Sequence, residues 1–269
     1  MAQIFSSFGS KVTVVERKDS AVEVIDSEVS SILIKSLEKS GIKFIFGKEI
    51  TEISGEKVLA GSEEVASAKV ILLTTREADL TALKDVNLEV SNGNVVANEK
   101  MQSSLKNIYV PGDVNGKNLL AHAAFKMGYV AASEIVEGKS DKYNNNIIPR
   151  AIYTYPEIGS VGLTEEEAKK SYDVKVGKFN YGANGRALAH GDSSGMVKII
   201  SDARYGEILG AHIVGPRASE LINEVSILMQ SEVIVEEAIK MVFGHPTFSE
   251  AIYEAIADVE GVSVHLPKK

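Results

Sequence analysis

The chain has 269 residues, of which 44% are hydrophobic, and a formal net charge of −8 at pH 7. This size and composition predict a globular protein with room for two domains. The acidic balance argues against a nucleic-acid surface, and no apolar run reaches the roughly 18 residues that cross a bilayer, so neither nucleic acid nor membrane is expected as a partner. The first residues lack the pattern of a secretory signal, which makes the cytoplasm the expected compartment. Cysteine is absent, which excludes disulfides and cysteine nucleophiles within this chain.

Residues 12–16 predict a buried strand that ends in Glu16. A Rossmann unit places at this point the carboxylate that binds the adenosine ribose, and a carboxylate favours NAD over NADP. The strand and glycine-rich turn that precede it in such a unit are missing, because only residues 1–9, which predict the end of a helix, come before it. A strand that merely ends in a solvated charge is the open alternative.

The next segment continues an α/β pattern. Asp26 or Ser27 can cap a helix whose apolar positions repeat at helical spacing up to Leu37, and Gly41 ends it. The strands that follow include a small β insertion. They are expected over residues 43–46, 50–53, 57–59 and 70–73.

The middle of the chain holds a second informative segment. Residues 107–110 predict a strand that ends at Gly112-Asp113, and a helix is predicted from Leu119 through Met127. The strand end presents a carboxylate, and the helix directs its N-terminal amides at the same place, which suits an anionic or carbonyl-bearing ligand. A plain strand-turn-helix with Asp113 as a turn residue is the alternative.

A polar run at residues 140–146 predicts a linker and a domain boundary. Antiparallel strands and then helices are predicted beyond it, which is the order of a sheet covered by helices on one face. The strands are expected over residues 174–180, 196–200 and 208–214, and the helices over 219–229 and 235–241.

The string His245-Pro246-Thr247-Phe248-Ser249-Glu250 lies close to the C-terminus. Proline suits the first turn of a helix and an apolar stripe at helical spacing follows, so His245 is expected just before a helix. Glu250, one turn in, can reach back to the ring and fix one imidazole tautomer, which is a general-base arrangement. A histidine that only caps or packs near a helix start is the alternative. No histidine has a second ligand at metal spacing, so no metal is expected.

These motifs, in this order, resemble the flavin-dependent pyridine nucleotide-disulfide oxidoreductases, and Ala251 after the histidine string is closer to the dihydrolipoamide dehydrogenase type. The resemblance covers essentially the whole chain and implies an α/β plus α+β protein that begins inside the NAD domain. It implies an incomplete Rossmann-like NAD domain at 1–78, a FAD-contacting segment at 79–145 and an interface or dimerisation domain at 146–269.

The resemblance also implies site roles. His245 would take a proton from a dithiol substrate in the partner subunit's site, and Glu250 would orient the histidine. Asp113 would bond the ribityl chain of FAD. The remaining cofactor contacts expected for FAD or NAD are Leu119, Leu120, Ala121, His122, Glu16 and Ile50.

The implied reaction passes electrons from a dihydrolipoyl dithiol through a cysteine disulfide and FAD to NAD. This chain lacks the cysteines and the first dinucleotide motif, and it has Thr75-Arg76-Glu77-Ala78 where the family has Gly-Arg-x-Pro. It is therefore expected to be the C-terminal part of such an enzyme, inactive alone. A non-catalytic dimerisation or binding module derived from the family is the alternative.

Three partners are expected from the resemblance. The first is a second copy, in a homodimer through residues after about 146, because apolar helix positions such as Leu221, Val225 and Leu228 exceed what one sheet face needs. The second is a separate N-terminal chain with FAD and the disulfide. The third is a lipoyl-bearing protein of a 2-oxoacid dehydrogenase or glycine cleavage system.

Overall fold

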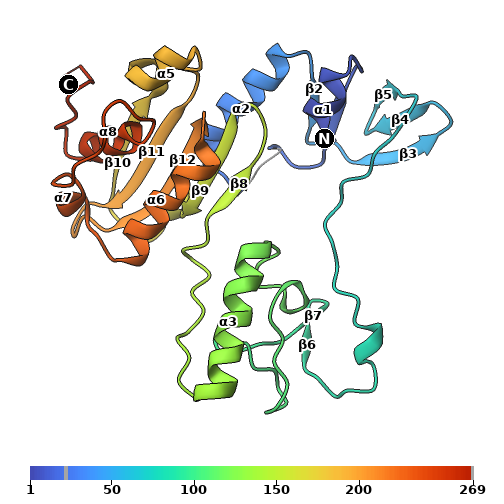
Figure 1. Cartoon of the computed structure of the whole chain (residues 1–269). Coiled ribbons are helices and arrows are strands. Elements are labelled where there is room, and N and C mark those ends of the chain that lie inside the picture. Colours follow the sequence, from blue (N-terminus) through green and yellow to red (C-terminus); the bar gives the residue numbers. More distant parts are fainter. Residues whose placement is uncertain (21–23, 268–269) are drawn as a thin grey trace. The chain divides into compact units, whose positions relative to one another are not determined.

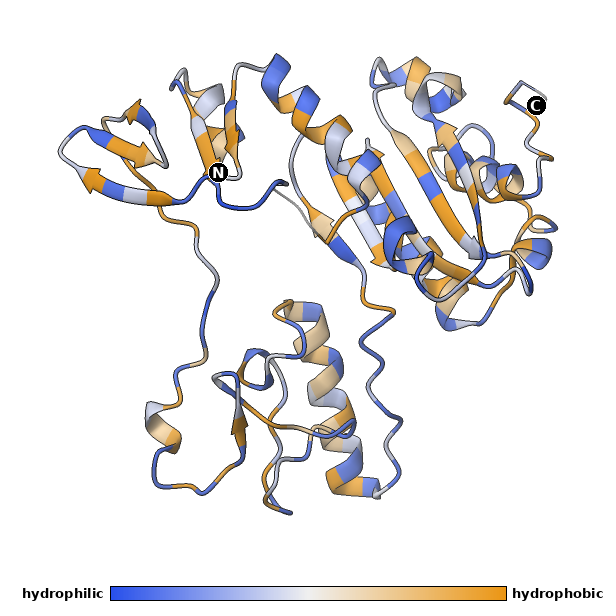
Figure 2. Cartoon of the chain, turned by 180° about the vertical axis from the view of Figure 1, so that it is seen from behind, coloured by the Kyte–Doolittle hydropathy of each residue, from blue (hydrophilic) through white to orange (hydrophobic). Residues whose placement is uncertain are grey.

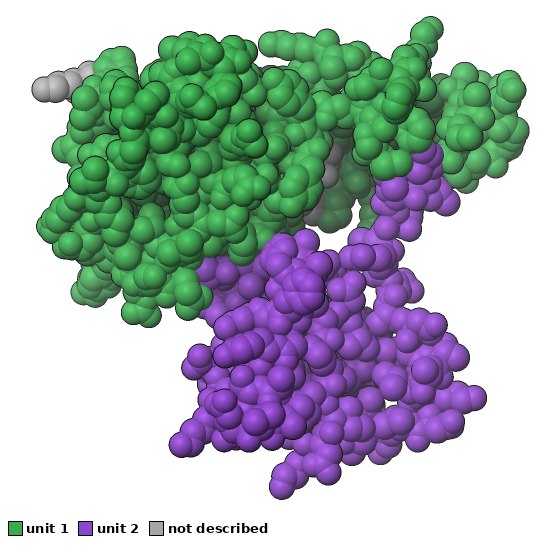
Figure 3. All heavy atoms as spheres, in the orientation of Figure 1, with its two compact units in different colours: residues 1–70, 149–269 green, residues 71–148 purple. Residues whose placement is uncertain are grey.

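The structure is a computed structural model that describes residues 1–20 and 24–267. It contains two compact units (Figure 3): one combines Met1–Val70 with Pro149–Lys269, and the other is Ile71–Ile148. The first part of the chain thus shares a unit with the last part, although the sequence separates them into two expected domains. The described helices include none that is long and apolar enough to cross a membrane.

The first seventy residues contain half of an α/β layer (Figure 1). β1 (Thr13–Glu16) pairs in parallel with β2 (Lys43–Phe46), and α2 (Ser27–Lys39) connects them. The Asp26 carboxylate accepts a hydrogen bond from the Glu28 N–H, so Asp26 is the cap of α2. Around this layer lie α1 (Ala2–Ser7) and an antiparallel sheet of β3 (Ile50–Ser54), β4 (Lys57–Ala60) and β5 (Glu63–Ala66).

A five-stranded antiparallel sheet in the order β10-β11-β12-β9-β8 forms the rest of this unit. Every residue of β11 (Met196–Asp202) and β12 (Ile208–Gly215) is buried, so both faces of these strands are covered. Helices α6 (Ala218–Gln230) and α8 (Glu250–Val259) pack on the sheet, and α2 packs on it as well. The other elements are β8 (Arg150–Ile152), β9 (Glu157–Gly162), α4 (Glu165–Ala168), β10 (Val174–Asn180), the 3-10 turn η3 (Tyr181–Ala183), α5 (Gly185–His190) and α7 (Val235–Ala238).

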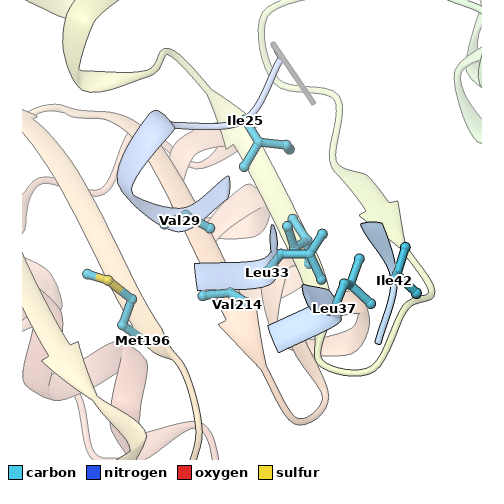
Figure 4. Packing of buried hydrophobic residues seen from close by; sticks show 8 residues of the cluster. Ile25, Val29, Leu33, Leu37, Ile42, Met196 and Val214 are labelled. Carbon is cyan, nitrogen blue, oxygen red and sulfur yellow. The ribbon is translucent and has the colours of Figure 1, made fainter. Parts of the chain in front are cut away.

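The expectation that helices cover only one face of this sheet is wrong, because α2 supplies the second layer. Val29, Leu33 and Leu37 of α2 belong to one hydrophobic cluster with Met196 and Val214 of the sheet (Figure 4). All five side chains are buried, and burial of one such side chain contributes roughly 1.5–3 kcal/mol relative to exposure. The helical spacing that predicts α2 therefore also defines the face with which it docks.

A polar group of side chains, here called the Lys198 cluster, continues this contact. The buried Lys198 Nζ lies 2.8 Å from Asp26 Oδ1 and 2.7 Å from Glu165 Oε2. His212, paired with Lys198 across β11 and β12, accepts the Asp26 N–H at its Nδ1 with a distance of 3.2 Å. Its Nε2 lies 3.1 Å from the Leu163 carbonyl, which fixes the Nε2–H tautomer. The cluster therefore fastens the start of α2 to the sheet.

Two glycines let helices approach the sheet closely. A Cβ on Gly177 of β10 would lie 2.0 Å from the Ala255 carbonyl oxygen of α8. A Cβ on Gly159 of β9 would lie 2.3 Å from the Ala218 carbonyl oxygen of α6. Both helices consequently rest on bare backbone at these points.

The unit of residues 71–148 is built around α3 (Ala121–Glu137). The strand expected over residues 70–73 is not formed, and Leu72 and Leu73 are exposed. The strand expected over 107–110 is not formed either, since this stretch makes only a single bridge between Tyr109 and Gln102. A strand exists only with a neighbour that shares its backbone hydrogen bonds. The 107–110 run shares two such bonds with residues 101–103, which makes a bridge and not a strand, and no described strand pairs with residues 70–73. Its short elements are η1 (Thr81–Leu83), β6 (Val90–Ser91), β7 (Asn94–Val95) and η2 (Asp113–Asn115).

Candidate functional site

His245 lies in the loop that leads into α8. Its Nδ1 is 2.8 Å from Glu250 Oε1, and the other Glu250 oxygen accepts the Thr247 N–H at 2.7 Å. Because an ionised carboxylate only accepts hydrogen bonds, Nδ1 carries the proton in the neutral ring and Nε2 is the proton acceptor. The His245 side chain is 75% exposed, so Nε2 is open to a substrate. The structure thus brings together the two residues that the sequence string proposes as a base and its orienting group.

The local geometry differs from the expected one. α8 begins at Glu250 itself, so His245 and Pro246 belong to the preceding loop and not to the first helical turn. The Ser249 hydroxyl bonds Glu224 instead of capping the helix. Glu250, the first residue of α8, therefore holds the preceding loop through its hydrogen bonds to the His245 ring and the Thr247 N–H.

Tertiary contacts hold this loop in place. The Thr247 carbonyl accepts a hydrogen bond from Asn184 Nδ2 at 3.0 Å, and the Thr247 hydroxyl donates to the Gly244 carbonyl at 2.7 Å. The Phe248 ring packs edge-on against the buried Tyr181 ring. Sequence patterns do not reveal the Asn184 contact, because 63 residues separate the two partners.

The electrostatics keep Glu250 ionised. Burial alone would raise the pKa of Glu250, but the Thr247 N–H and the His245 ring outweigh it and lower the pKa below the ordinary glutamate value. A carboxylate that remains charged at neutral pH can also stabilise an imidazolium at His245. The pair can therefore accept a proton at Nε2 and balance the resulting charge.

A second group of expected site residues lies in the unit of residues 71–148. The half-exposed Asp113 carboxylate lies 3.5 Å from the guanidinium of Arg76, which also donates to the Leu119 carbonyl at 3.0 Å. Gly112 has a φ of +85°, a conformation that glycine tolerates best, and its N–H donates to the Met127 sulfur. The turn that presents Asp113 is thus fixed by a buried residue of α3.

α3 begins at Ala121, slightly later than expected, and extends ten residues beyond Met127. Leu120 is its N-terminal cap residue and makes no side-chain capping bond, while Ala121 and His122 are exposed. The first amides of a 17-residue helix favour a carbonyl or an anion, and Asp113 accepts hydroxyl donors. These residues fit one side of a cofactor that carries both a polyol chain and a carbonyl-bearing ring, as FAD does.

The two residues expected at the NAD side lie in the other unit. Glu16 ends β1, and its carboxylate accepts the Lys18 N–H at 3.0 Å, which closes a local turn. Ile50 begins β3 and is exposed. Their role in NAD binding stays a prediction. Within residues 1–20 and 24–267, no three His, Asp or Glu side chains are arranged to hold a metal ion.

Comparison with known families identifies the chain. Residues 1–128 match the family described as pyridine nucleotide-disulphide oxidoreductase, and residues 148–256 match the dimerisation domain of the pyridine nucleotide-disulphide oxidoreductases. The chain belongs to this family and carries its dimerisation domain. The resemblance and the fold class expected from the sequence are confirmed.

Individual relatives point to one branch of the family. The dihydrolipoyl dehydrogenase of Bacillus subtilis is 33% identical over 273 residues, which are 98% of this chain and 59% of the relative. That of Thermus scotoductus is 35% identical over 280 residues, which are 99% of this chain and 60% of the relative. The chain therefore spans only about three fifths of these relatives.

Solved structures agree with the fold. A Cu(II) complex of the HOCl-induced flavoprotein disulfide reductase RclA from Escherichia coli has a TM-score of 0.87 at 25% identity, over 96% of this chain and 60% of that chain. LpdA from Mycobacterium tuberculosis has a TM-score of 0.87 at 21% identity, over 95% of this chain and 57% of that chain. The second likeness supports the fold alone.

Proposed function

We propose that this chain is the C-terminal part of a dihydrolipoamide dehydrogenase-like flavoenzyme, which oxidises a dihydrolipoyl dithiol with NAD through FAD and a cysteine disulfide. The observation that carries the proposal is the 2.8 Å pair of His245 Nδ1 and Glu250 Oε1. This pair leaves the exposed Nε2 as a proton acceptor, in a chain whose relatives are dihydrolipoyl dehydrogenases.

In this proposal a substrate thiol gives its proton to His245 Nε2, and the thiol sulfur becomes the nucleophilic thiolate. Glu250 holds the ring in the required tautomer and balances the positive charge. FAD, when bound, supplies the two-electron transfer between the disulfide and NAD. Its contacts would be Asp113 and the start of α3, namely Leu119, Leu120, Ala121 and His122. Glu16 and Ile50 would contact NAD.

The proposal includes a homodimer. The positions invoked from the sequence need correction, because Leu221 and Val225 are buried and Leu228 is partly buried within one chain, in a helix that packs on the sheet. The exposed apolar side chains of this part include Ile227 and Val242, with Val242 97% exposed. They lie within the dimerisation domain, so we expect a dimer in sedimentation at tens of micromolar. The proposed substrate is a lipoyl-bearing protein, and the proposed compartment is the cytoplasm.

The test restores the missing part of the enzyme. The portion of the Bacillus subtilis relative without a counterpart here is fused ahead of Met1, and dithiol-dependent NAD reduction is measured. His245→Gln should lower turnover by roughly 10²–10⁴-fold, the usual contribution of a positioned acid–base group, and Glu250→Gln should lower it less. Melting temperature, flavin content and NADH oxidation by an artificial acceptor serve as controls and should stay unchanged. Normal dithiol turnover in His245→Gln would remove His245 from the mechanism.

The unfused chain gives a separate check. Asp113 and α3 cover one side of FAD, and the glycine-rich turn that binds the pyrophosphate is absent from the sequence. We expect weak FAD binding or none, and therefore colourless purified protein. Stoichiometric flavin that survives gel filtration would contradict this expectation.

A further inference from the structure

A buried asparagine closes the turn that presents Asp113. Asn115 lies two residues beyond Asp113 and is 8% exposed. Its backbone N–H donates to the Gly112 carbonyl at 3.1 Å, and its Nδ2 donates to the Val110 carbonyl at 2.7 Å. Its Oδ1 accepts the Lys117 N–H at 2.9 Å. A single residue therefore connects the backbone on both sides of the turn.

The Asn115 amide also contacts two methionine sulfurs. Its Nδ2 lies 3.3 Å from the Met127 sulfur and 3.6 Å from the Met101 sulfur, and both methionines are fully buried. Hydrophobic residues extend along much of α3, the helix that carries Met127 (Figure 2). A thioether is a weak acceptor, so these contacts stabilise the fold less than an oxygen acceptor would. Their main consequence is that the amide is held in one direction, between the two sulfurs.

Met101 holds the same turn from a strained backbone conformation. Its φ is +63°, which is uncommon for a residue with a long side chain. The Met101 carbonyl accepts the Val110 N–H at 2.8 Å, so Met101 contacts the turn through its backbone as well as through its sulfur. Backbone strain persists only where the surrounding contacts over-determine it, and strained residues are concentrated at functional sites. The support of this turn is therefore specific in both its side chains and its backbone.

We infer that Asn115 is a positioning residue for the flavin. It holds the backbone of residues 110–113 against Met101 and Met127, and so sets the place at which the Asp113 carboxylate meets a ligand hydroxyl. This inference rests on the proposed function, in which Asp113 bonds the ribityl chain, and adds the buried residue that holds Asp113 in place. The energy of a hydrogen bond falls steeply with lost alignment, so a small displacement of Asp113 is enough to weaken binding.

The first part of the experiment uses the whole unfused chain. Asn115→Ala removes the side-chain bonds of the turn, and Met127→Leu nearly keeps the side-chain volume but removes the sulfur that accepts the Gly112 N–H. Met196→Leu is the matched control, because it makes the same exchange in a core cluster of apolar residues. Hydrogen exchange of the Gly112 amide, followed by NMR, should become faster in the first two variants and stay unchanged in the control. Circular dichroism checks that all three variants fold.

The second part measures FAD affinity in the chain fused to the missing part of the Bacillus subtilis relative. Titration followed by flavin fluorescence gives the dissociation constant of the folded protein. Asn115→Ala should raise this constant about tenfold, which corresponds to the loss of one or two hydrogen bonds. Met127→Leu should raise it less, and Met196→Leu should leave it unchanged. A lower melting temperature of Asn115→Ala with unaltered FAD affinity would overturn the inference, because Asn115 would then serve stability alone. An equal rise in Met196→Leu would overturn it as well.

The two proposals fail in different ways. Weakened FAD binding in Asn115→Ala, together with full dithiol turnover in the fused His245→Gln protein, would keep Asn115 as a positioning residue and reject the acid–base role. Unaltered FAD binding in Asn115→Ala, together with lost turnover in His245→Gln, would reject Asn115 and keep the acid–base role. Failure of the unaltered fused protein to bind FAD would overturn both.

Discussion

The sheet of residues 149–269 and helix α3 differ in how completely each is covered within its own unit. β11 and β12 are buried along their whole length, because α2 lies on one face and other helices lie on the opposite face. α3 has a core on one face and an exposed stripe on the other. The difference shows that residues 1–70 complete the sheet of the last part of the chain, whereas the unit of residues 71–148 covers only one face of α3 by itself.

The largest expected effect comes from breaking the Lys198 cluster. Lys198→Met leaves the buried Asp26 carboxylate without its cation, which should lower the free energy of unfolding by roughly 3–5 kcal/mol. The matched control is Lys178→Met, whose partner Glu28 is exposed, and it should change stability by about 1 kcal/mol or less. Urea denaturation measures the free energy of unfolding of both variants. Equal losses of stability would show that the Lys198 cluster contributes no more than an exposed ion pair.

A smaller effect is expected where α8 meets β10. Gly177→Ala forces a Cβ against the Ala255 carbonyl, and α8 must move away, at a cost of about 1–3 kcal/mol for overpacking. Gly182→Ala is the control, because nothing lies within 4 Å of its added Cβ. Thermal unfolding distinguishes them. A loss of stability no greater than that of Gly182→Ala would mean that α8 does not pack directly against the backbone of β10 at Gly177.

His212 predicts a pH dependence for the same region. Burial lowers the pKa of His212, so the folded protein keeps this ring neutral while the unfolded chain binds a proton below about pH 6.5. Stability should therefore fall as the pH decreases from about 6.5, by at most about 1.4 kcal/mol per pH unit for this one group. Asp26, whose lowered pKa acts with the same sign, contributes only near pH 4 and below.

Urea denaturation at a series of pH values between 4.5 and 8, an interval chosen to lie above the Asp26 range of about pH 4, checks this prediction. His212→Gln can keep both hydrogen bonds and cannot titrate, so its stability should depend less on pH in this range. An identical pH dependence in the two proteins would show that His212 is not its source.

The smallest effect is expected on the exposed face of α3, which carries Phe125 and Tyr129. Phe125→Ser removes a side chain that is 79% exposed, so the stability of the isolated chain should change by no more than about 0.5 kcal/mol. Differential scanning calorimetry of the unaltered chain and of Phe125→Ser measures this change in stability. A loss of stability well above 1 kcal/mol would show that this face of α3 is covered within the chain and would remove the contrast with the sheet.

Local signals in the sequence predict local structure here. The cap Asp26 and the helical spacing of α2 identify a helix, and the five-residue separation of His245 and Glu250 identifies a pair that the structure joins. The strand expected at 70–73 fails because an apolar run does not reveal whether a neighbouring strand exists. The bond between Lys198 and Asp26 spans 172 residues, and no periodic pattern connects such distant positions.

The double contact of Arg76, to Asp113 and to the Leu119 carbonyl, changes how affinity at this turn should be understood. The Asp113 carboxylate already has a cationic neighbour in Arg76. A ligand hydroxyl that binds Asp113 therefore replaces part of an existing contact, and does not only add a new hydrogen bond. The net free energy is then the difference between the new hydrogen bond and the weakened contact with a solvent-exposed guanidinium. In return, Arg76 holds the turn and the helix start at a fixed separation before any ligand arrives, which reduces the conformational entropy that binding must remove.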